Sequence, residues 1–152
     1  MRIIIDADGC PREVLTMSQR LAGCFGLGLW TVASHHHELN GTCHIMVGDA
    51  PEETDIKIVN MAQPGDIVIT HDLGLAAMVL PKKVRCLSPS GGEYRESSLT
   101  FRLEERALKA RMRRSGTRTP GPSKRTRDDD RRFEAALRSL LEQSRSSDEL
   151  RC

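Results

Sequence analysis

Short apolar runs recur along residues 3–87, and each is followed by a turn or by a segment of helical spacing. Runs that are apolar on both faces are typical of buried strands in parallel sheets. Five such runs predict strands at residues 3–5, 27–33, 43–47, 67–70 and 84–87. The pattern therefore predicts an α/β fold built around a central, mainly parallel five-stranded sheet.

Apolar residues at helical spacing predict the helices between and after these strands. The first helix is expected to begin near Pro11, since proline is favoured at the first helical position, and to end at residues 23–26. Further helices are predicted at residues 52–62, 73–80, 99–112 and 128–141. The second and third strands are joined only by a polar loop around His35, His36 and His37, so that loop must carry the crossover.

The periodic pattern stops at residues 113–127, which are rich in Ser, Thr, Pro, Gly and Arg. This composition is typical of an extended connector. It divides the chain into an α/β domain at residues 1–112, the connector, and a C-terminal helix with its tail at residues 128–152. Three aspartates at 128–130 suit the start of that last helix, and we expect the residues after about 144 to fray.

Carboxylates follow the two most apolar strands. Asp6 and Asp8 end the first strand at alternate positions, and Asp72 follows the fourth. These two strands are expected to be the adjacent central pair, so their carboxyl ends form one edge where α/β proteins place ligands. Asp55, in the first turns of the helix at 52–62, is expected to complete an acidic pocket.

Clustered carboxylates repel one another unless a cation joins them. Oxygen ligands suit Mg²⁺ or Mn²⁺ better than zinc, which prefers nitrogen and sulfur. Such a cation can bind a phosphodiester and lower the pKa of an attacking water, and a second ion about 3.5–4 Å away can stabilise the leaving oxygen. The sequence thus predicts a metal site formed by Asp6, Asp8, Asp55 and Asp72.

Several of these acids also have simpler structural explanations. Asp72 stands before an apolar helical segment and suits an N-cap, and Asp8 can cap the helix that opens at Pro11. Asp49 and Asp66 lie in glycine-containing turns, where aspartate is common. Asp6 is the hardest to explain structurally, because an acid that ends a buried strand needs partners or a metal.

The histidine and cysteine residues indicate no zinc or disulfide framework. His35, His36 and His37 are consecutive and do not converge easily on one tetrahedral centre, so an exposed loop is expected. The five cysteines are scattered without a CxxC pair, which favours reduced thiols in a cytoplasmic protein. Cys10, near a helix start, is either a nucleophile of lowered pKa or a small buried residue, and the second is favoured.

Charge is unevenly distributed along the chain. Residues 1–100 hold 8 Lys or Arg against 12 Asp or Glu, net −4, and the remaining residues hold 15 against 9, net +6. The basic second half favours a polyanionic partner, although a solvated charged tail explains it about as well. The basic residues expected to contact nucleic acid are Arg113, Arg114, Arg118, Lys124 and Arg125. No apolar run approaches the roughly 20 residues of a membrane span, and the N-terminus enters a strand directly instead of a signal peptide.

Four motifs resemble those of the YaiI/YqxD family of uncharacterised bacterial proteins, also called UPF0178 or DUF188, within the PIN-like group. They are IDADGCP at residues 5–11, TDIKI at 54–58, GDIVITHDLGLA at 65–76 and RRSGTRTPGP at 113–122. Two departures concern the rim of the pocket. Ser34 stands where the family has Asn, and Ser88-Pro89-Ser90-Gly91 replaces its Asn-Pro-Arg-Gly turn.

The resemblance implies a PIN-like three-layer α/β/α fold whose acidic pocket binds Mg²⁺ or Mn²⁺ and hydrolyses RNA or single-stranded nucleic acid. Carried over by position, Asp6 and Asp72 are the catalytic acids, Asp55 is the helical acid and Asp8 is an additional metal ligand. Asp66 also matches a family position. The resemblance therefore implies a metal-dependent nuclease-like protein.

Two other functions remain open. PIN-like folds can lose catalysis and serve as RNA-binding or interaction modules, and the basic second half suits phosphate contacts without cleavage. A strand that ends in DxD also opens the haloacid-dehalogenase-like phosphatases, in which Asp6 would be the nucleophile and Asp8 a general acid. Against that class, Cys10 replaces the Thr or Val usual after DxD, and the chain is short.

Overall fold

A computed structural model describes residues 1–34, 42–121 and 123–150 of the chain. Its strands are β1 Arg2–Asp6, β2 Gly28–Ala33, β3 Cys43–Met46, β4 Ile67–Ile69, β5 Arg85–Leu87 and β6 Glu93–Tyr94. Its helices are α1 Arg12–Phe25, α2 Glu53–Met61, α3 Leu73–Val79, α4 Glu96–Arg114 and α5 Arg127–Glu149, with a 3₁₀ turn at Leu80–Lys82. The predicted loop around His35, His36 and His37 lies outside the described residues.

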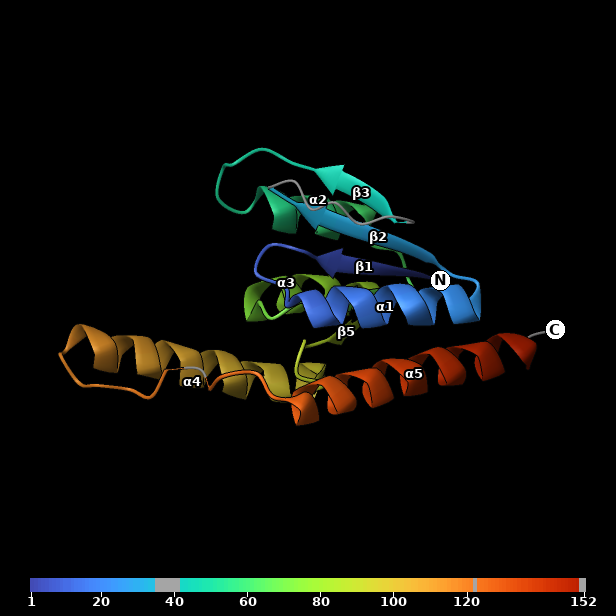
Figure 1. The fold of residues 1–152 in the computed structure, drawn as a ribbon. Coiled ribbons are helices and arrows are strands. Elements are labelled where there is room, and N and C mark those ends of the chain that lie inside the picture. Colours follow the sequence, from blue (N-terminus) through green and yellow to red (C-terminus); the bar gives the residue numbers. More distant parts are fainter. Residues whose placement is uncertain (35–41, 122, 151–152) are drawn as a thin grey trace.

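The strands form one sheet in the order β3-β2-β1-β4-β5-β6 (Figure 1). Every pair is parallel except β5 with β6, which is antiparallel. The predicted adjacency of the first and fourth strands is confirmed, since Ile3 pairs with Ile67 and Ile5 with Ile69. The predicted count of five strands was wrong because β6 has only two residues, too few for an alternating pattern to show.

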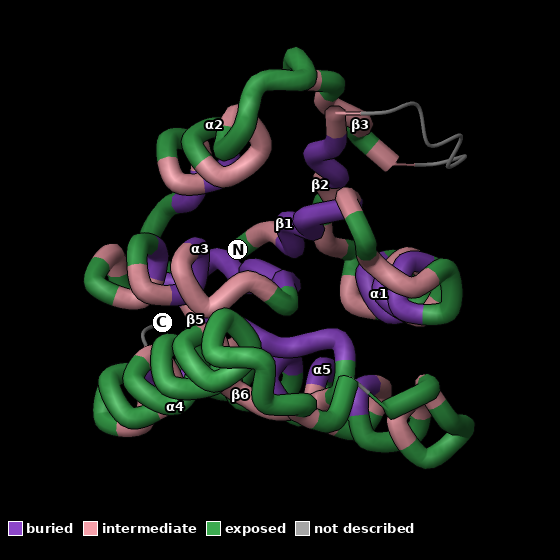
Figure 2. Tube along the Cα trace, turned by 90° about the vertical axis from the view of Figure 1, so that its left-hand side faces the viewer, coloured by how far each residue is buried: buried purple, intermediate pink, exposed green. Residues whose placement is uncertain are grey.

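Alternation along the strands supplies two separate cores, one on each face of the sheet. Ile3 and Ile5 pack with α1 and α5, whereas Ile4 packs with α2, α3 and the start of α4. All three isoleucines are fully buried. This arrangement confirms the expected three-layer α/β/α architecture. In Figure 2 the buried residues lie in the strands and in helices on both faces of the sheet.

The C-terminal helix belongs to this layered structure. Phe133, Leu137 and Leu141 of α5 are fully buried in the same core cluster as α1 and β1. A capping box at Thr126 and Asp129 starts the helix. α5 continues to Glu149, eight residues beyond the predicted end at 141. The division of the chain at residues 113–127 stays a prediction.

The fourth helix starts earlier than its apolar pattern indicated. α4 runs from Glu96 to Arg114 instead of 99–112. Only its first turns pack on the sheet, through Leu99 and Leu103, and the rest extends beyond the sheet with its surface exposed (Figures 1 and 2). Within the described ranges, none of the helices combines the length and apolar character needed to cross a membrane.

Candidate active site

The predicted acids meet at the carboxyl ends of β1 and β4, where the strand order reverses direction. Chain connections leave this point on opposite sides, and open α/β sheets bind ligands there. A pocket of about 330 Å³ opens at this edge, and its lining includes all four predicted metal ligands. They are Asp6, Asp8, Asp55 and Asp72. We call it the carboxylate pocket.

Asp6 is the most buried of the four acids. It is the last residue of β1 and is only 6% exposed. The hydroxyl of Thr70, at the end of β4, donates a hydrogen bond to Asp6 Oδ2 over 2.9 Å. Burial raises the pKa of Asp6 to about 6, the Thr70 hydrogen bond opposes that shift, and the nearby charge of Asp55 adds to it. Asp6 is therefore a carboxylate that gains from a nearby cation.

Asp8 is held by neighbouring backbone and hydroxyl groups. The pairing of β1 with β2 extends one residue further, through the Ala7 N–H to the Val32 carbonyl, so Asp8 returns to the side of Asp6. Both Asp8 oxygens accept from the Ser34 N–H, at 3.1 and 3.0 Å, and Oδ2 also accepts from the Thr54 hydroxyl at 2.9 Å. Ser34 contributes through its backbone, so the family asparagine is not needed for this contact.

Asp72 caps α3 and also faces the carboxylate pocket. Its Oδ1 caps α3 by accepting from the N–H groups of Gly74 and Leu75, at 2.7 and 3.3 Å. Its own N–H donates to the Thr70 hydroxyl at 3.0 Å, which ties it to Asp6. The N-cap interpretation is therefore confirmed, while the same residue lines the carboxylate pocket.

Asp55 enters the pocket from the first turn of α2. Partial burial raises its pKa, and the nearby charges of Asp72 and Glu52 raise it further, while His71 opposes them. Glu52, just before the helix, adopts a left-handed backbone conformation at φ 69°. Such a conformation in a non-glycine residue costs of order 1–3 kcal/mol and clusters at functional sites.

The oxygen donors suit Mg²⁺ or Mn²⁺ in chemistry but do not form a closed ligand cage. Among the described residues, no three His, Cys, Asp or Glu side chains are grouped closely enough to hold a metal ion. Asp8 and Asp72 already accept hydrogen bonds from the protein. Mg²⁺ is usually held by one or two carboxylates, with water and substrate phosphates completing its octahedron. The pocket fits that open kind of site.

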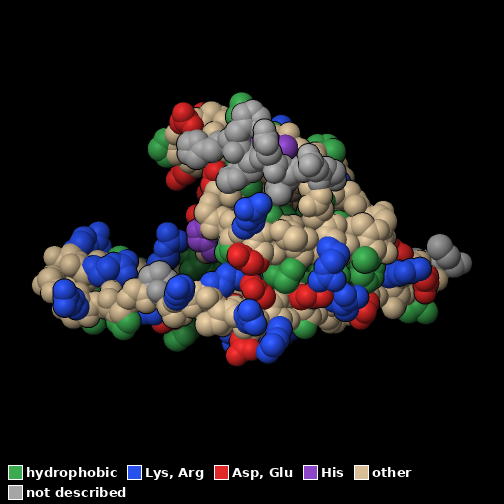
Figure 3. Space-filling view, viewed as in Figure 1, with side chains coloured by type: hydrophobic (Ala, Val, Ile, Leu, Met, Phe, Trp, Pro, Cys, Tyr) green, Lys and Arg blue, Asp and Glu red, His purple; other side chains and the backbone are tan. Residues whose placement is uncertain are grey.

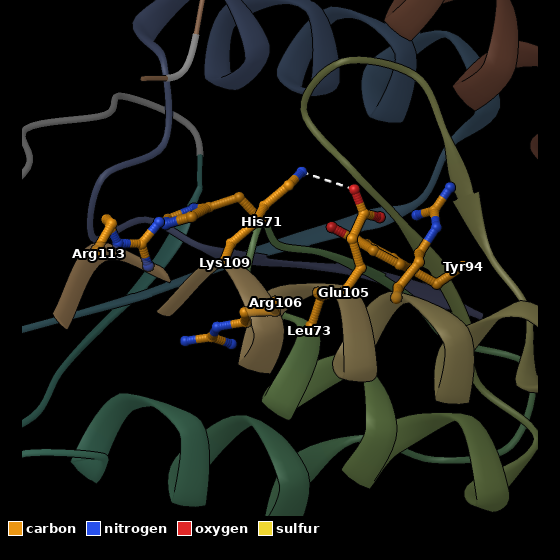
Figure 4. A pocket seen from close by; sticks show the side chains of 8 residues that line it. His71, Leu73, Tyr94, Glu105, Arg106, Lys109 and Arg113 are labelled. Carbon is orange, nitrogen blue, oxygen red and sulfur yellow. Dashed lines mark ion pairs between the residues drawn. The ribbon is translucent and has the colours of Figure 1, made fainter. Parts of the chain in front are cut away.

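A second pocket adjoins the first. It measures about 400 Å³ and lies along α4, with His71 in the lining of both pockets. We call it the α4 groove; its basic side chains are Arg102, Arg106, Lys109 and Arg113. Figure 4 shows Lys109, Arg113 and His71 from α4 and the end of β4 gathered around one hollow. His71, Arg102, Arg106 and Lys109 were not among the predicted site residues.

The predicted nucleic-acid contacts are dispersed. Arg113 lines the α4 groove, whereas Arg114, Arg118 and Lys124 are exposed on the end of α4 and on the connector. Lys and Arg side chains gather over this end of the molecule in Figure 3.

Arg125 lies apart from the α4 groove. Its Nε pairs with Asp130 at 2.7 Å and its Nη1 donates to the Pro89 carbonyl at 2.7 Å. Arg125 therefore connects the Ser88–Gly91 turn to the start of α5.

Other sequence candidates lie outside the carboxylate pocket or at its rim. Asp66 is a turn residue, as predicted, and its buried carboxylate accepts from the Gln63 N–H. It also forms an ion pair at 2.7 Å with Arg2, whose side chain is partly exposed. Asp49 lines the pocket from its turn. Burial and the nearby Asp6 raise the pKa of the Cys10 thiol to about 12, so this thiol is no activated nucleophile.

Comparison with known proteins agrees with the sequence motifs. A family model described as "Uncharacterized BCR, YaiI/YqxD family" matches residues 4–143. A UPF0178 protein of Heliobacterium modesticaldum is 54% identical over 141 residues, which cover 93% of this chain and 97% of that protein. UPF0178 proteins of Exiguobacterium sibiricum and Clostridium acetobutylicum are 38% and 37% identical, over 93% of this chain and 96% and 97% of their own lengths. No solved structure matches the chain. The chain therefore belongs to the YaiI/YqxD (UPF0178) family of uncharacterised bacterial proteins.

Proposed function

We propose that the protein is a PIN-like, metal-dependent phosphodiesterase that cleaves RNA or single-stranded nucleic acid in the carboxylate pocket. One observation carries the proposal. Four acids from β1, its following turn, α2 and the start of α3 line a single pocket at the switch point of the sheet. Carboxylates gathered in one pocket repel one another, and a divalent cation together with a phosphate is the chemistry that stabilises them.

The four acids have distinct roles in this proposal. Asp6 and Asp72 are the catalytic acids, and Asp8 and Asp55 extend the oxygen ligand set. When bound, Mg²⁺ or Mn²⁺ would supply charge for the phosphate and lower the pKa of a water molecule. Thr70 holds Asp6 in place and the Ser34 N–H holds Asp8, so both carboxylates are fixed before substrate arrives.

A non-catalytic nucleic-acid-binding module is the second candidate. It is favoured by the hydrogen bonds that already occupy Asp8 and Asp72, and by the absence of a closed three-ligand group among the described residues. Both candidate functions use the adjoining basic groove, so only cleavage of the bound nucleic acid distinguishes the enzyme from the non-catalytic module. A phosphatase of the haloacid-dehalogenase type would instead form a phospho-aspartate at Asp6, which acid-quench trapping detects.

The test measures Mn²⁺ binding by calorimetry and cleavage of single-stranded RNA by the native chain, by Asp6→Asn and by Asp148→Asn. Asp148 carries the same change on the exposed end of α5 and serves as the matched control. We expect Asp6→Asn to show no heat of Mn²⁺ binding and to cleave RNA about 10²-fold more slowly or worse, whereas Asp148→Asn should behave like the native chain. If the native chain shows no heat of Mn²⁺ binding, the proposed metal site is rejected. If it binds Mn²⁺ and RNA without cleavage, the protein is a non-catalytic binding module.

A further inference from the structure

The α4 groove is a candidate binding surface in its own right. Its four cations stand at positions 102, 106, 109 and 113, a spacing of four, three and four residues that aligns them on one side of a helix. At about 1.5 Å per residue the row is about 17 Å long. That length spans a few nucleotides of an extended strand.

The row is continuous with the carboxylate pocket. His71 lines both, and Arg106 Nη1 lies 3.8 Å from Asp72 Oδ1. The lining therefore changes from basic in the α4 groove to acidic in the carboxylate pocket, with His71 between the two. A polyanion held along α4 is directed toward the acids, where it meets repulsion unless a cation is bound.

The shape of the groove favours one strand. A hollow of about 400 Å³ is of the size that takes a small ligand, so it suits the phosphates and sugars of one strand better than both strands of a duplex. Tyr94, the aromatic residue in its lining, is only 5% exposed and lies beneath Arg102, whose guanidinium is 5.4 Å from the ring centroid. A base cannot stack on a ring covered in this way, so Tyr94 offers no platform for base readout and the cations are the main recognition feature of the groove.

The cations of the groove are easily released to a ligand. Lys109 pairs with Glu105 at 2.6 Å, and Arg106 pairs with Asp72. The Lys109 and Arg106 side chains are more than half exposed, and exposed ion pairs of this kind contribute little net stability. Among the described residues, Glu105 is also the one acid in the lining of the groove, so it opposes an incoming phosphate.

We propose that the α4 groove binds the phosphate backbone of single-stranded nucleic acid, without base specificity, and delivers it to the carboxylate pocket. Delivery for cleavage rests on the proposed function, whereas the binding itself does not. Arg102, Arg106, Lys109 and Arg113 contact successive phosphates. His71 marks the point where the strand passes from the groove into the pocket.

Binding is measured in EDTA, where the metal-dependent reaction is silent. The probe is a fluorescein-labelled oligouridylate of about 12 nucleotides, followed by anisotropy over a range of salt concentrations. The test variant is Arg102→Gln/Arg106→Gln/Lys109→Gln. The matched control is Arg131→Gln/Arg138→Gln/Arg145→Gln, which removes the same charge from three ion-paired residues of α5.

We expect the α4 variant to bind at least about tenfold more weakly at 0.1 M salt, and its slope of log K against log[salt] to fall by about 2. The α5 control should retain native affinity. An oligodeoxythymidylate of the same length should bind comparably, and a blunt duplex more weakly. Equal losses in both triple variants, tighter binding of the duplex, or no binding by the native chain would each overturn the proposal.

A change of opposite sign excludes a general loss of structure. Glu105→Gln frees Lys109 and removes the acid from the groove, so affinity should rise several-fold; an unchanged or weaker affinity contradicts the assignment. Failure of the proposed function has a different signature. In that case the native chain binds RNA through α4 in EDTA but neither binds Mn²⁺ nor cleaves.

Discussion

The hydroxyl of Thr70 donates to Asp6 Oδ2 over 2.9 Å and so joins the ends of the two central strands. The Thr70 hydroxyl oxygen in turn accepts a hydrogen bond from the Asp72 N–H at 3.0 Å. Thr70 itself is 1% exposed. One buried hydroxyl therefore sets the position of both proposed catalytic acids, although Thr70 carries no charge and is not one of the proposed metal ligands.

Replacing Thr70 tests this linkage. Thr70→Val removes a buried donor to Asp6 and an acceptor for Asp72, so the unfolding free energy should fall by about 1–3 kcal/mol. Because the Thr70 hydrogen bond lowers the pKa of Asp6, the pH at which Mn²⁺ binding is half-maximal should move upward. Urea unfolding and calorimetry at several pH values measure both. Thr70→Ser keeps the hydroxyl and should restore the pH midpoint; a Ser variant that behaves like Val would contradict this role.

Asp6 should destabilise the protein when it is ionised. Its pKa is raised from 3.8 to about 6 in the folded state, so the contribution of Asp6 to the unfolding free energy is fully present below pH 4 and is lost as pH rises through 6. Asp6→Asn, which keeps an acceptor for Thr70, should therefore stabilise the metal-free protein by about 2–3 kcal/mol at pH 7.5 and by little at pH 4. Urea unfolding in EDTA measures the difference.

Asp66→Asn is the matched control for Asp6→Asn. It makes the same substitution just before β4, at the opposite edge of the sheet from Asp6, in a buried carboxylate that accepts from Arg2 and the Gln63 N–H. There the carboxylate has a cationic partner, so the substitution should destabilise the protein by about 1–3 kcal/mol at pH 7.5. Stabilisation by Asp66→Asn would contradict the stabilising role of its ion pair with Arg2. Destabilisation by Asp6→Asn would contradict the unfavourable burial of the ionised Asp6 carboxylate.

Gly91 should not tolerate a side chain. Its φ is 91°, and an added Cβ would lie 2.6 Å from the backbone carbonyl carbon of Arg132 on α5. Gly91→Ala should lower the unfolding free energy by about 2 kcal/mol or more, because α5 has to move away from the turn. Gly23→Ala, in α1 with nothing within 4 Å of the added Cβ, should instead stabilise by about 0.5–1 kcal/mol. Thermal unfolding of both variants measures the difference. Similar changes in Tm for the two variants would contradict the close contact between Gly91 and the Arg132 backbone.

Truncation of Leu137 tests the packing of α5. Leu137 is fully buried in the core shared with α1 and β1, so Leu137→Ala should cost about 2–5 kcal/mol. Ser139→Ala, an exposed change on the same helix, should have little effect. A small effect of Leu137→Ala would mean that α5 is only loosely attached to the sheet.

Local signals were sufficient to predict most of the sheet and the acids at its edge. The triple isoleucine of β1 and the Ile67–Ile69 run are buried on both faces, so their pattern indicates central strands without further information. Asp6, Asp8 and Asp72 follow from those strands because a strand end fixes where the next side chains lie. β6 has only two residues and depends on pairing with Cys86 and Leu87, a contact that local spacing does not encode.

The basic side of the site needed the tertiary structure. The helical spacing of Arg102, Arg106 and Lys109 is visible in the sequence, but their proximity to His71 depends on how α4 crosses the end of β4. Arg125 illustrates the reverse case. It belongs to the basic stretch, yet its guanidinium is held by the Pro89 carbonyl and Asp130.

The position of α5 has a consequence for the order in which the fold can be completed. The face of the sheet that packs on α2, α3 and α4 has all its covering residues once Leu103 has been synthesised. The opposite face, with Ile3, Ile5 and Leu87, also requires Phe133 to Leu141. A growing chain therefore keeps one apolar face of its sheet incompletely covered until its last helix is made, and an interrupted chain is left with an aggregation-prone surface.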